Sequence, residues 1–304
     1  MTVVVTTFER PRLAGRLIDA LAAQRRPADA VVVVDDGSVS SMAELAAEVR
    51  ARGWTFITQT NQGLSAARNT GAAAATTDWL AFVDDDDVVE DGWLEALSAL
   101  LSPGIGLASC GARYVDEKGV LVHAVEPRSM GPAYDDLYAN MLAGCFVVRR
   151  DIFDDAGGYA VGLRCSHQSE LTLRLAPALA ASGLGTASTP ERLIRLDRRQ
   201  ATARPMSSPE ALLQGSTFVL ARHADRLARD PQHLAGFHAV AGTSAARLER
   251  WGEARSHLFR AARIGGGGNA WLRVAVSLVP PLARRVWRSA AFRGVSTGPT
   301  AVAP

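Results

Sequence analysis

The chain has 304 residues, 48% of them hydrophobic, and its 33 basic and 31 acidic side chains leave a formal net charge of +2. A chain of this length can bury a large core and hold a smaller second domain. The near balance of charge gives no electrostatic reason to expect a nucleic-acid partner, so we expect none. No apolar stretch is long enough to span a bilayer, because the best candidate, residues 270–286, is interrupted by arginines and prolines.

The cysteines and the first residues bear on location. Cys110, Cys145 and Cys165 are odd in number and widely separated, which fits neither a disulfide framework nor a zinc site. Residues 1–5 lack the basic segment of a secretory signal and have the pattern of a strand. We therefore expect a protein of the reducing cytoplasm.

The first hundred residues alternate short β-branched runs with amphipathic segments, which predicts repeated strand–helix–strand units. The expected fold class is α/β, with a Rossmann-like, mostly parallel central sheet flanked by helices. Residues 30–34 are apolar throughout, as expected of a strand covered on both faces. The expected strands are residues 3–5, 30–34, 55–58 and 79–83, and the expected helices cover residues 13–21, 42–49, 64–75 and 93–101.

The second half of the chain has a different pattern. Residues 105–125 and 145–148 are strand-like and predict a mixed region, and a helix is expected to begin near Gln168. After residue 205 the sequence is rich in alanine, arginine and leucine and predicts helices to about residue 286. We expect one domain over residues 1–205, a helical domain over residues 206–288 and a disordered tail over residues 289–304.

Four consecutive aspartates, residues 84–87, directly follow the apolar run 79–83, where a buried parallel strand would end. Adjacent carboxylates resist burial unless a cation or hydrogen-bond donors neutralise them, which points to a divalent metal and a metal-bound phosphate. Asp35 and Asp36 follow the strand at residues 30–34 and could line the same crevice, because ligands bind beyond the carboxyl ends of such strands. The alternative is that both acidic segments are ordinary turns that cap the following helices.

Four segments in chain order resemble the inverting nucleotide-sugar glycosyltransferases of family 2, which have the A-type (GT-A) fold. The last of them occupies the place of the family's DXD element. Each segment is short, but all four stand in the right order at strand or helix ends, and the resemblance covers residues 1–205. The segments are residues 3–11, 33–38, 61–71 and 82–87.

The resemblance implies roles for several residues. A nucleotide-diphosphate sugar would be the donor, and Mg²⁺ or Mn²⁺ would neutralise the diphosphate as negative charge builds on the leaving group. Asp86 would be the principal metal ligand, together with Asp84. The remaining donor-site assignments are Thr6, Phe8 and Asp36 at the base, Arg68 and Asp84 near the ribose and phosphates, and Asp85 beside them. Asp87 is more readily a capping residue or a group that supports the ligands without binding the metal itself.

One position departs from the family pattern. The family carries a Glu-Asp pair whose aspartate is the general base, and here the pair is His167-Gln168. A carboxamide cannot take a proton at neutral pH, so Gln168 cannot inherit the role. His167, as an imidazole of ordinary pKa about 6.5, and Glu170, the next acidic residue, are the catalytic candidates. His167 could instead be a metal ligand, or a helix-start residue without chemistry.

The resemblance implies a metal-dependent inverting transfer of a sugar to an acceptor hydroxyl, in the biosynthesis of a cell-envelope polysaccharide, a glycolipid or a glycosylated natural product. A first alternative is transfer to a lipid-linked phosphate, which is already anionic and makes the Gln168 departure harmless. A second alternative is a nucleotide-binding scaffold that has lost the chemistry. The presence of Arg68, Asp84 and Asp86 weighs against the scaffold, since packing gives no reason to keep such a cluster.

The end of the chain bears on partners. Arginines between residues 260 and 288 are interleaved with leucines, valines and tryptophan, a pattern compatible with helices on an anionic membrane surface. Helices packed on the catalytic domain or on a second subunit are the alternative. The expected location is thus cytoplasmic, with peripheral contact to the inner face of the membrane, while the acceptor and the oligomeric state stay open.

Overall fold

The computed structural model describes residues 1–116, 118–197, 208–265 and 268–288. Its contacts divide the chain into two units, each of which is described by itself. Unit 1 comprises Met1–Ser129, Leu137–Gly162 and Arg174–Ala203, and unit 2 comprises Met130–Asp136, Leu163–Leu173 and Arg204–Pro304. The expected boundary near residue 205 and the expected tail over residues 289–304 lie outside the described residues, and the three-part division stays a prediction.

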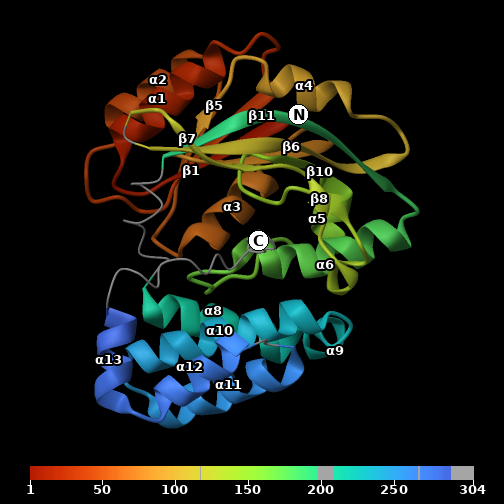
Figure 1. Ribbon diagram of the computed structural model, residues 1–304. Coiled ribbons are helices and arrows are strands. Elements are labelled where there is room, and N and C mark those ends of the chain that lie inside the picture. The colour runs from red at the N-terminus through yellow and green to blue at the C-terminus, as the bar shows by residue number, and fades with distance from the viewer. Residues whose placement is uncertain (117, 198–207, 266–267, 289–304) are drawn as a thin grey trace. The chain divides into compact units, whose positions relative to one another are not determined.

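The first half of the sheet in unit 1 is parallel, as the sequence predicts. Its strands lie in the order β3 (Thr55–Thr58), β2 (Ala30–Asp35), β1 (Thr2–Thr7) and β4 (Trp79–Asp84) (Figure 1). The register places Val5 of β1 between Val33 of β2 and Val83 of β4, so the acidic residues after β2 and β4 follow neighbouring strand ends.

The second half of the sheet is mixed. β10 (Phe146–Arg149) lies antiparallel between β4 and β6 (Ile105–Val115), whereas β11 (Gly185–Asp197) runs parallel to β6. Antiparallel strands β7 (Leu121–Val125) and β5 (Val88–Val89) pair with β6 and β11 respectively. The short strands β8 (Arg128–Ser129) and β9 (Tyr138–Ala139) form a separate pair.

Helices cover both faces of this sheet. α1 (Pro11–Ala22), α2 (Ala43–Ala51) and α4 (Trp93–Ala99) lie on one face, and α3 (Leu64–Ala73) and α5 (Arg150–Asp155) lie on the other (Figure 1). Side chains alternate along a strand, so Val3 and Val5 join the core under α1, α2 and α4, whereas Val4 faces α3 at Gly71. Burial on both faces explains why the strands are apolar throughout.

Unit 2 is mainly helical. Its described residues contain η1 (Pro132–Tyr134), the first turns of α6 (His167–Ala181), and six further helices. These are α8 (Pro209–Arg222), α9 (Ala224–Leu227), α10 (Pro231–Arg247), α11 (Trp251–Ile264), α12 (Gly268–Ser277) and α13 (Pro280–Arg288). Small residues let α10 and α11 approach closely, and Leu213, Leu258 and Trp287 fill the core between the helices. None of the described helices is long and apolar enough to cross a membrane.

Candidate active site

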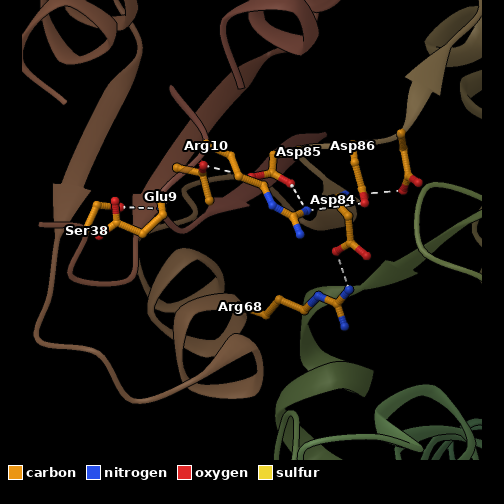
Figure 2. A network of polar contacts seen from close by, with 9 residues as sticks. Glu9, Arg10, Ser38, Arg68, Asp84, Asp85 and Asp86 are labelled. Atoms are coloured by element: carbon orange, nitrogen blue, oxygen red, sulfur yellow. Dashed lines mark hydrogen bonds and ion pairs between the residues drawn. The ribbon is translucent and has the colours of Figure 1, made fainter. Parts of the chain in front are cut away.

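The site lies at the carboxyl edge of the parallel strands in unit 1. Thr6 of β1 stands beside Asp84 of β4, and Thr7 stands beside Asp35 of β2, so the loops that follow these strands meet at one edge. Figure 2 shows the loop after β1 between the acidic cluster and the loop after β2. This is the edge at which open α/β sheets bind ligands.

The four aspartates are buried and form a compact turn. The Thr7 hydroxyl donates to Asp85 Oδ2 at 2.8 Å, and Arg10 Nη1 lies 3.4 Å from Asp85 Oδ1 and 3.3 Å from Asp86 Oδ2 (Figure 2). The Asp84 backbone N–H donates to Asp87 Oδ2 at 3.3 Å, and the Asp87 N–H donates to the Asp84 carbonyl at 3.0 Å. Asp87 therefore closes the turn of the acidic cluster, and its expected role as a cap or as a group that supports the ligands stays a prediction.

Burial changes the acidity of this cluster. It raises the pKa of Asp85 to about 6, although the Thr7 hydroxyl and the Arg10 guanidinium oppose the shift and neighbouring carboxylates add to it. A carboxyl group with such a pKa is poorly solvated, and a cation placed beside it would favour its ionised form. The cluster thus has the electrostatic character of a cation site.

Arg68 provides a fixed positive charge on the other side of Asp84. It lies one turn into α3, is 2% exposed, and its Nη2 donates to Asp84 Oδ1 at 2.5 Å (Figure 2). Burial alone would lower the pKa of Arg68, but the charge of Asp84 and, after it, the electrostatic effect of Tyr159 outweigh burial, so the pKa is raised; the guanidinium also lies 4.9 Å from the centroid of the Tyr159 ring. Arg68 Nε is buried without a hydrogen-bond partner within the described part of the chain. The sequence-predicted proximity of Arg68 and Asp84 is observed, and one donor remains for a ligand oxygen.

Asp36 holds two loops together. Its carboxylate accepts hydrogen bonds from Gln59 Nε2 at 2.8 Å, from the Gln62 N–H at 3.0 Å and from the Gly63 N–H at 2.8 Å. The neighbouring Gly37 has a φ of 79°, and a Cβ there would lie 2.6 Å from a backbone nitrogen, so only glycine fits. Asp36 thereby fixes the loop after β2 against the start of α3, and its contact with a nucleobase stays a prediction.

Thr6 and Phe8 add a polar and an aromatic group to this edge. Thr6 Oγ1 is buried and lacks a hydrogen-bond partner within the described residues, while Phe8, directly after β1, is 45% exposed. The next residue, Glu9, has a φ of 57°, and its N–H donates to Ser38 Oγ at 2.8 Å (Figure 2). An unsatisfied hydroxyl and an exposed ring beside two pinned loops fit a ligand with a polar, planar part.

The two catalytic candidates belong to unit 2. His167 is buried at the first residue of α6, directly after Ser166, whose φ of 64° is unusual for a residue other than glycine. Glu170 is 0% exposed, and its Oε1 lies 3.1 Å from His223 Nε2 and 3.4 Å from Arg222 Nε. The structure thus gives Glu170 two cationic or hydrogen-bonding partners, Arg222 at the end of α8 and His223 directly after it.

Sequence reasoning missed several residues that shape these sites. Thr7, Arg10 and Tyr159 contact the acidic cluster or Arg68, and His223 contacts Glu170. Thr7 and Arg10 lie within the first segment that carries the family resemblance, so a signal existed for them. No local pattern pointed to His223.

Comparison with known proteins identifies the family. Residues 2–157, just over half of the chain, match the model of Glycosyl transferase family 2. The chain belongs to this family. The family and the glycosyltransferase class predicted from the sequence are therefore confirmed.

Relatives of this family 2 glycosyltransferase include the pre-mycofactocin glycosyltransferase of Mycobacterium tuberculosis. The two are 28% identical over 255 residues, which cover 75% of this chain and 49% of the relative. The chain spans less than two thirds of the length of its curated relatives, for example 14% of glycosyltransferase GlyA of Streptococcus pneumoniae and 61% of an uncharacterised glycosyltransferase of Haemophilus influenzae.

Solved structures confirm the A-type fold. TarS of S. aureus, crystallised with UDP-GlcNAc, aligns with a TM-score of 0.58 and 16% identity over 94% of this chain and 91% of TarS. The mannosyltransferase PcManGT of Pyrobaculum calidifontis, in complex with GDP-Man and Mn²⁺, aligns with a TM-score of 0.55 and 19% identity over 95% of this chain and 87% of PcManGT. At these identities the likeness establishes the fold alone.

The donor set of this family 2 glycosyltransferase fits a hard divalent cation that shares its ligands with a substrate. No group of three or more histidine, cysteine, aspartate or glutamate side chains is arranged to hold a metal by itself among the described residues. Mg²⁺ is commonly held by one or two carboxylates and completed by phosphate oxygens and water. The neighbouring carboxylates of Asp84 and Asp86 suit that mode of binding.

Proposed function

We propose that this chain transfers a sugar from a nucleotide-diphosphate sugar to an acceptor hydroxyl, with a divalent metal and with inversion at the anomeric carbon. The observation that carries the proposal is the buried cluster at the carboxyl end of β4, where Asp84 pairs with Arg68 and Asp86 lies beside Arg10. The family match over residues 2–157 supports it, as do the UDP-GlcNAc complex of TarS and the GDP-Man and Mn²⁺ complex of PcManGT.

The proposed donor site assigns each group a task. Thr6, Phe8 and Asp36 hold the base, and Arg68 with Asp85 lies toward the ribose and phosphates. Asp86, helped by Asp84, holds Mg²⁺ or Mn²⁺, which neutralises the charge that develops on the departing diphosphate. The groups around Arg68 fix its guanidinium before the donor binds, so little reorganisation is needed during the reaction.

His167 is the proposed general base, and Glu170 is the second candidate. A base must reach the acceptor hydroxyl and change its protonation state during the reaction. Glu170 is fully buried and its Oε1 lies 3.1 Å from His223 Nε2 and 3.4 Å from Arg222 Nε, an arrangement that favours a structural role. His167 follows the strained Ser166 at the start of α6, and strained backbone is concentrated at functional sites.

A donor panel tests the reaction. Purified protein is incubated with UDP-sugars and GDP-sugars with and without EDTA, and release of nucleoside diphosphate is measured. The proposal predicts release from at least one donor, loss of release with EDTA and its recovery when Mn²⁺ is added in excess. Release that EDTA leaves unchanged would contradict the proposed metal dependence. Absence of both donor binding and turnover would contradict the proposed enzymatic activity.

Substitution of His167 separates its roles. If it is the base, His167→Ala lowers turnover by about 10²–10⁴-fold and leaves the Kd of the donor with metal unchanged in titration calorimetry. The matched control is His123→Ala, on exposed β7. Loss of metal-dependent donor binding in His167→Ala would make it a metal ligand instead. Glu170→Gln is expected to lower the free energy of unfolding. Its effect on turnover, measured at a temperature where the variant is folded, should be the smaller of the two effects.

The same variant decides between acceptor classes. An acceptor hydroxyl needs a base, whereas a lipid-linked phosphate is already anionic and needs none. Retained turnover of His167→Ala on a lipid phosphate, with loss of turnover on saccharide hydroxyls, would favour the phosphate acceptor that the Gln168 position also allows.

A further inference from the structure

The exposed apolar side chains of unit 2 are concentrated at its C-terminal end. Within the described part of unit 2, every large hydrophobic side chain that is exposed lies between residues 259 and 282. They are Phe259 (45% exposed), Trp271 (47%), Leu272 (61%), Leu278 (61%), Val279 (49%) and Leu282 (46%), and together we call them the apolar surface. Single exposed hydrophobics are ordinary on a protein surface, but a cluster of this kind marks a contact site.

The apolar surface is formed by α11, α12, α13 and the turn between α12 and α13. The rings of Phe259 on α11 and Trp271 on α12 meet edge to face, with centroids 5.7 Å apart. Trp271 and Leu272 lie on α12, Leu278 and Val279 lie in the turn between α12 and α13, and Leu282 lies in the first turn of α13. Ala283 and Trp287 of α13 are buried in the helical core instead. The helices are therefore anchored by one face and present the other.

Arginines are interleaved in the sequence with the residues of the apolar surface. Residues 254–288 contain seven arginines and neither aspartate nor glutamate. The Arg263 guanidinium lies 5.9 Å from the Phe259 ring centroid, and Arg260 and Arg285 are also exposed. Arg284 Nη2 lies 2.7 Å from Glu249 Oε2 in an ion pair. We therefore assign Arg284 to the internal contacts of unit 2 and do not count it among the arginines that face a ligand. The same helices thus present exposed aromatic and aliphatic groups together with exposed arginines.

We propose that the apolar surface docks this protein on an anionic phospholipid bilayer. Aromatic and aliphatic side chains enter the boundary between headgroups and acyl chains, and the exposed arginines bind lipid phosphates. The described helices are too short and too polar to span the bilayer, so the segment lies on the membrane surface. A second copy of the chain fits less well, because a symmetric contact would bring two sets of arginines together. The proposal does not depend on the proposed sugar transfer.

Vesicle flotation with the full chain tests the docking. We expect binding to vesicles that contain phosphatidylglycerol and little binding to pure phosphatidylcholine. Combined Trp271→Ser and Leu272→Ser substitutions should lower the partition coefficient about tenfold or more, as should combined Arg263→Glu and Arg285→Glu substitutions. Release of nucleoside diphosphate from a soluble donor should be unchanged in both variants, which separates this test from that of the catalytic proposal.

Matched controls come from exposed residues of unit 1. Leu121→Ser with Val161→Ser removes comparably exposed apolar groups, and Arg16→Glu with Arg195→Glu makes the same change of charge. Both controls should bind vesicles as the unchanged chain does. Quenching of tryptophan fluorescence by brominated lipid gives a second measurement, and Trp271→Phe, which retains an aromatic ring, should remove most of the quenching while binding persists.

Three results would overturn the proposal. The first is equal partition of the unchanged chain into anionic and neutral vesicles. The second is vesicle binding by the Trp271/Leu272 variant at the level of the controls. The third is light scattering that shows an oligomer which the same variant dissociates, with vesicle binding unaffected, because the apolar surface would then be covered by a second copy.

Discussion

Arg68 keeps its charge in a buried position because Asp84 faces it. Taking a guanidinium and a carboxylate out of water costs several kcal/mol per ion, and their attraction repays that cost only when the geometry and hydrogen bonding are good. Arg68 Nε lacks a partner within the described residues, so the pair is not fully satisfied. An unsatisfied donor beside a carboxylate cluster is better explained by ligand binding than by stability.

The pair can be tested by removing one charge and then both. Arg68→Met should lower the free energy of unfolding by about 3–5 kcal/mol, because the buried Asp84 carboxylate loses its counter-charge. Arg68→Met combined with Asp84→Asn should recover most of that loss. Urea unfolding at neutral pH, followed by circular dichroism, measures both.

The control for this cycle is a solvent-exposed pair in the same unit. Arg113 and Glu90 lie 2.6 Å apart, and their side chains are 37% and 36% exposed. Arg113→Met should therefore cost about 1 kcal/mol or less. Two results would show that the buried Asp84 carboxylate does not need Arg68 as its counter-charge. One is an equal loss in the free energy of unfolding for Arg68→Met and Arg113→Met, and the other is no recovery in the double variant.

At the scale of the element, local patterns predicted the first half of the sheet well. Residues 30–34 were expected as a strand and Ala30–Asp35 is observed, because an unbroken β-branched run has few other stable arrangements. The two-residue β5 could not be predicted, since its partners Ile194 and Arg195 lie about a hundred residues further along the chain. The bulges of β11 likewise depend on pairing with β6, which leaves no local pattern.

The candidate site shows the same difference between residues marked by a local pattern and contacts between residues far apart in the sequence. Asp84, Asp86 and Arg68 stand in segments with a recognisable order, so the sequence could mark them. Arg10 reaches Asp86 across 76 positions and His223 reaches Glu170 across 53, and neither contact leaves a trace in local spacing. The sequence therefore indicated which groups could bind a donor, and only the fold showed what neutralises and holds them.

The packing of α3 on β1 depends on a glycine. A Cβ at Gly71 would lie 2.3 Å from Val4 Cγ1 and 3.3 Å from Val34 Cγ2, both in the fully buried core. Gly71→Ala should lower the free energy of unfolding by about 1–3 kcal/mol because the helix must move away from the strand. Urea unfolding measures the change, and Val4→Ala in the same chain should restore part of it.

Gly15 on α1 is the matched control. A Cβ there meets no atom within 4 Å. Gly15→Ala should raise the free energy of unfolding by up to about 1 kcal/mol, since alanine favours the helix. If Gly71→Ala is as stabilising as Gly15→Ala, the contact between α3 and β1 is looser than described.

The contact of α10 with α11 contains a histidine pair that makes stability depend on pH. His238 Nδ1 lies 2.9 Å from His257 Nδ1. Burial, then His257 and Arg260, lower the pKa of His238 to about 4, and burial lowers that of His257 although Glu253 opposes the shift. Above the unfolded pKa of about 6.5 both states are neutral, and below it the unfolded state gains protons first.

The histidine pair should therefore contribute a loss of stability, on the order of 1–3 kcal/mol, as the pH falls from about 6.5 to about 4, while Asp85, whose pKa is raised, contributes in the opposite direction. Urea unfolding across this range measures the loss. His238→Gln combined with His257→Gln should flatten this part of the profile, whereas His123→Gln, on exposed β7, should leave it unchanged. An unchanged slope in the double variant would assign the acid sensitivity to other groups.

At the scale of the whole molecule, binding at the acidic cluster should be visible as stability. A ligand that binds only the folded chain stabilises it in proportion to the logarithm of its concentration, by about 2.7 kcal/mol at one hundred times its Kd. For a chain of 304 residues that corresponds to a rise in Tm of roughly 4 °C. Neither the nucleoside diphosphate nor Mn²⁺ alone should reach this value, since the metal needs phosphate oxygens to complete its ligands.

Differential scanning calorimetry with nucleoside diphosphate and Mn²⁺ together checks the expectation. Asp86→Asn should lose most of the rise in Tm, because it removes a charged metal ligand, and His167→Ala should keep it, because the proposed base does not hold the donor. Asp91→Asn, at an exposed acidic residue shortly after β5, is the matched control and should behave as the unchanged chain. A rise that persists in EDTA and in Asp86→Asn would place the nucleotide away from the acidic cluster.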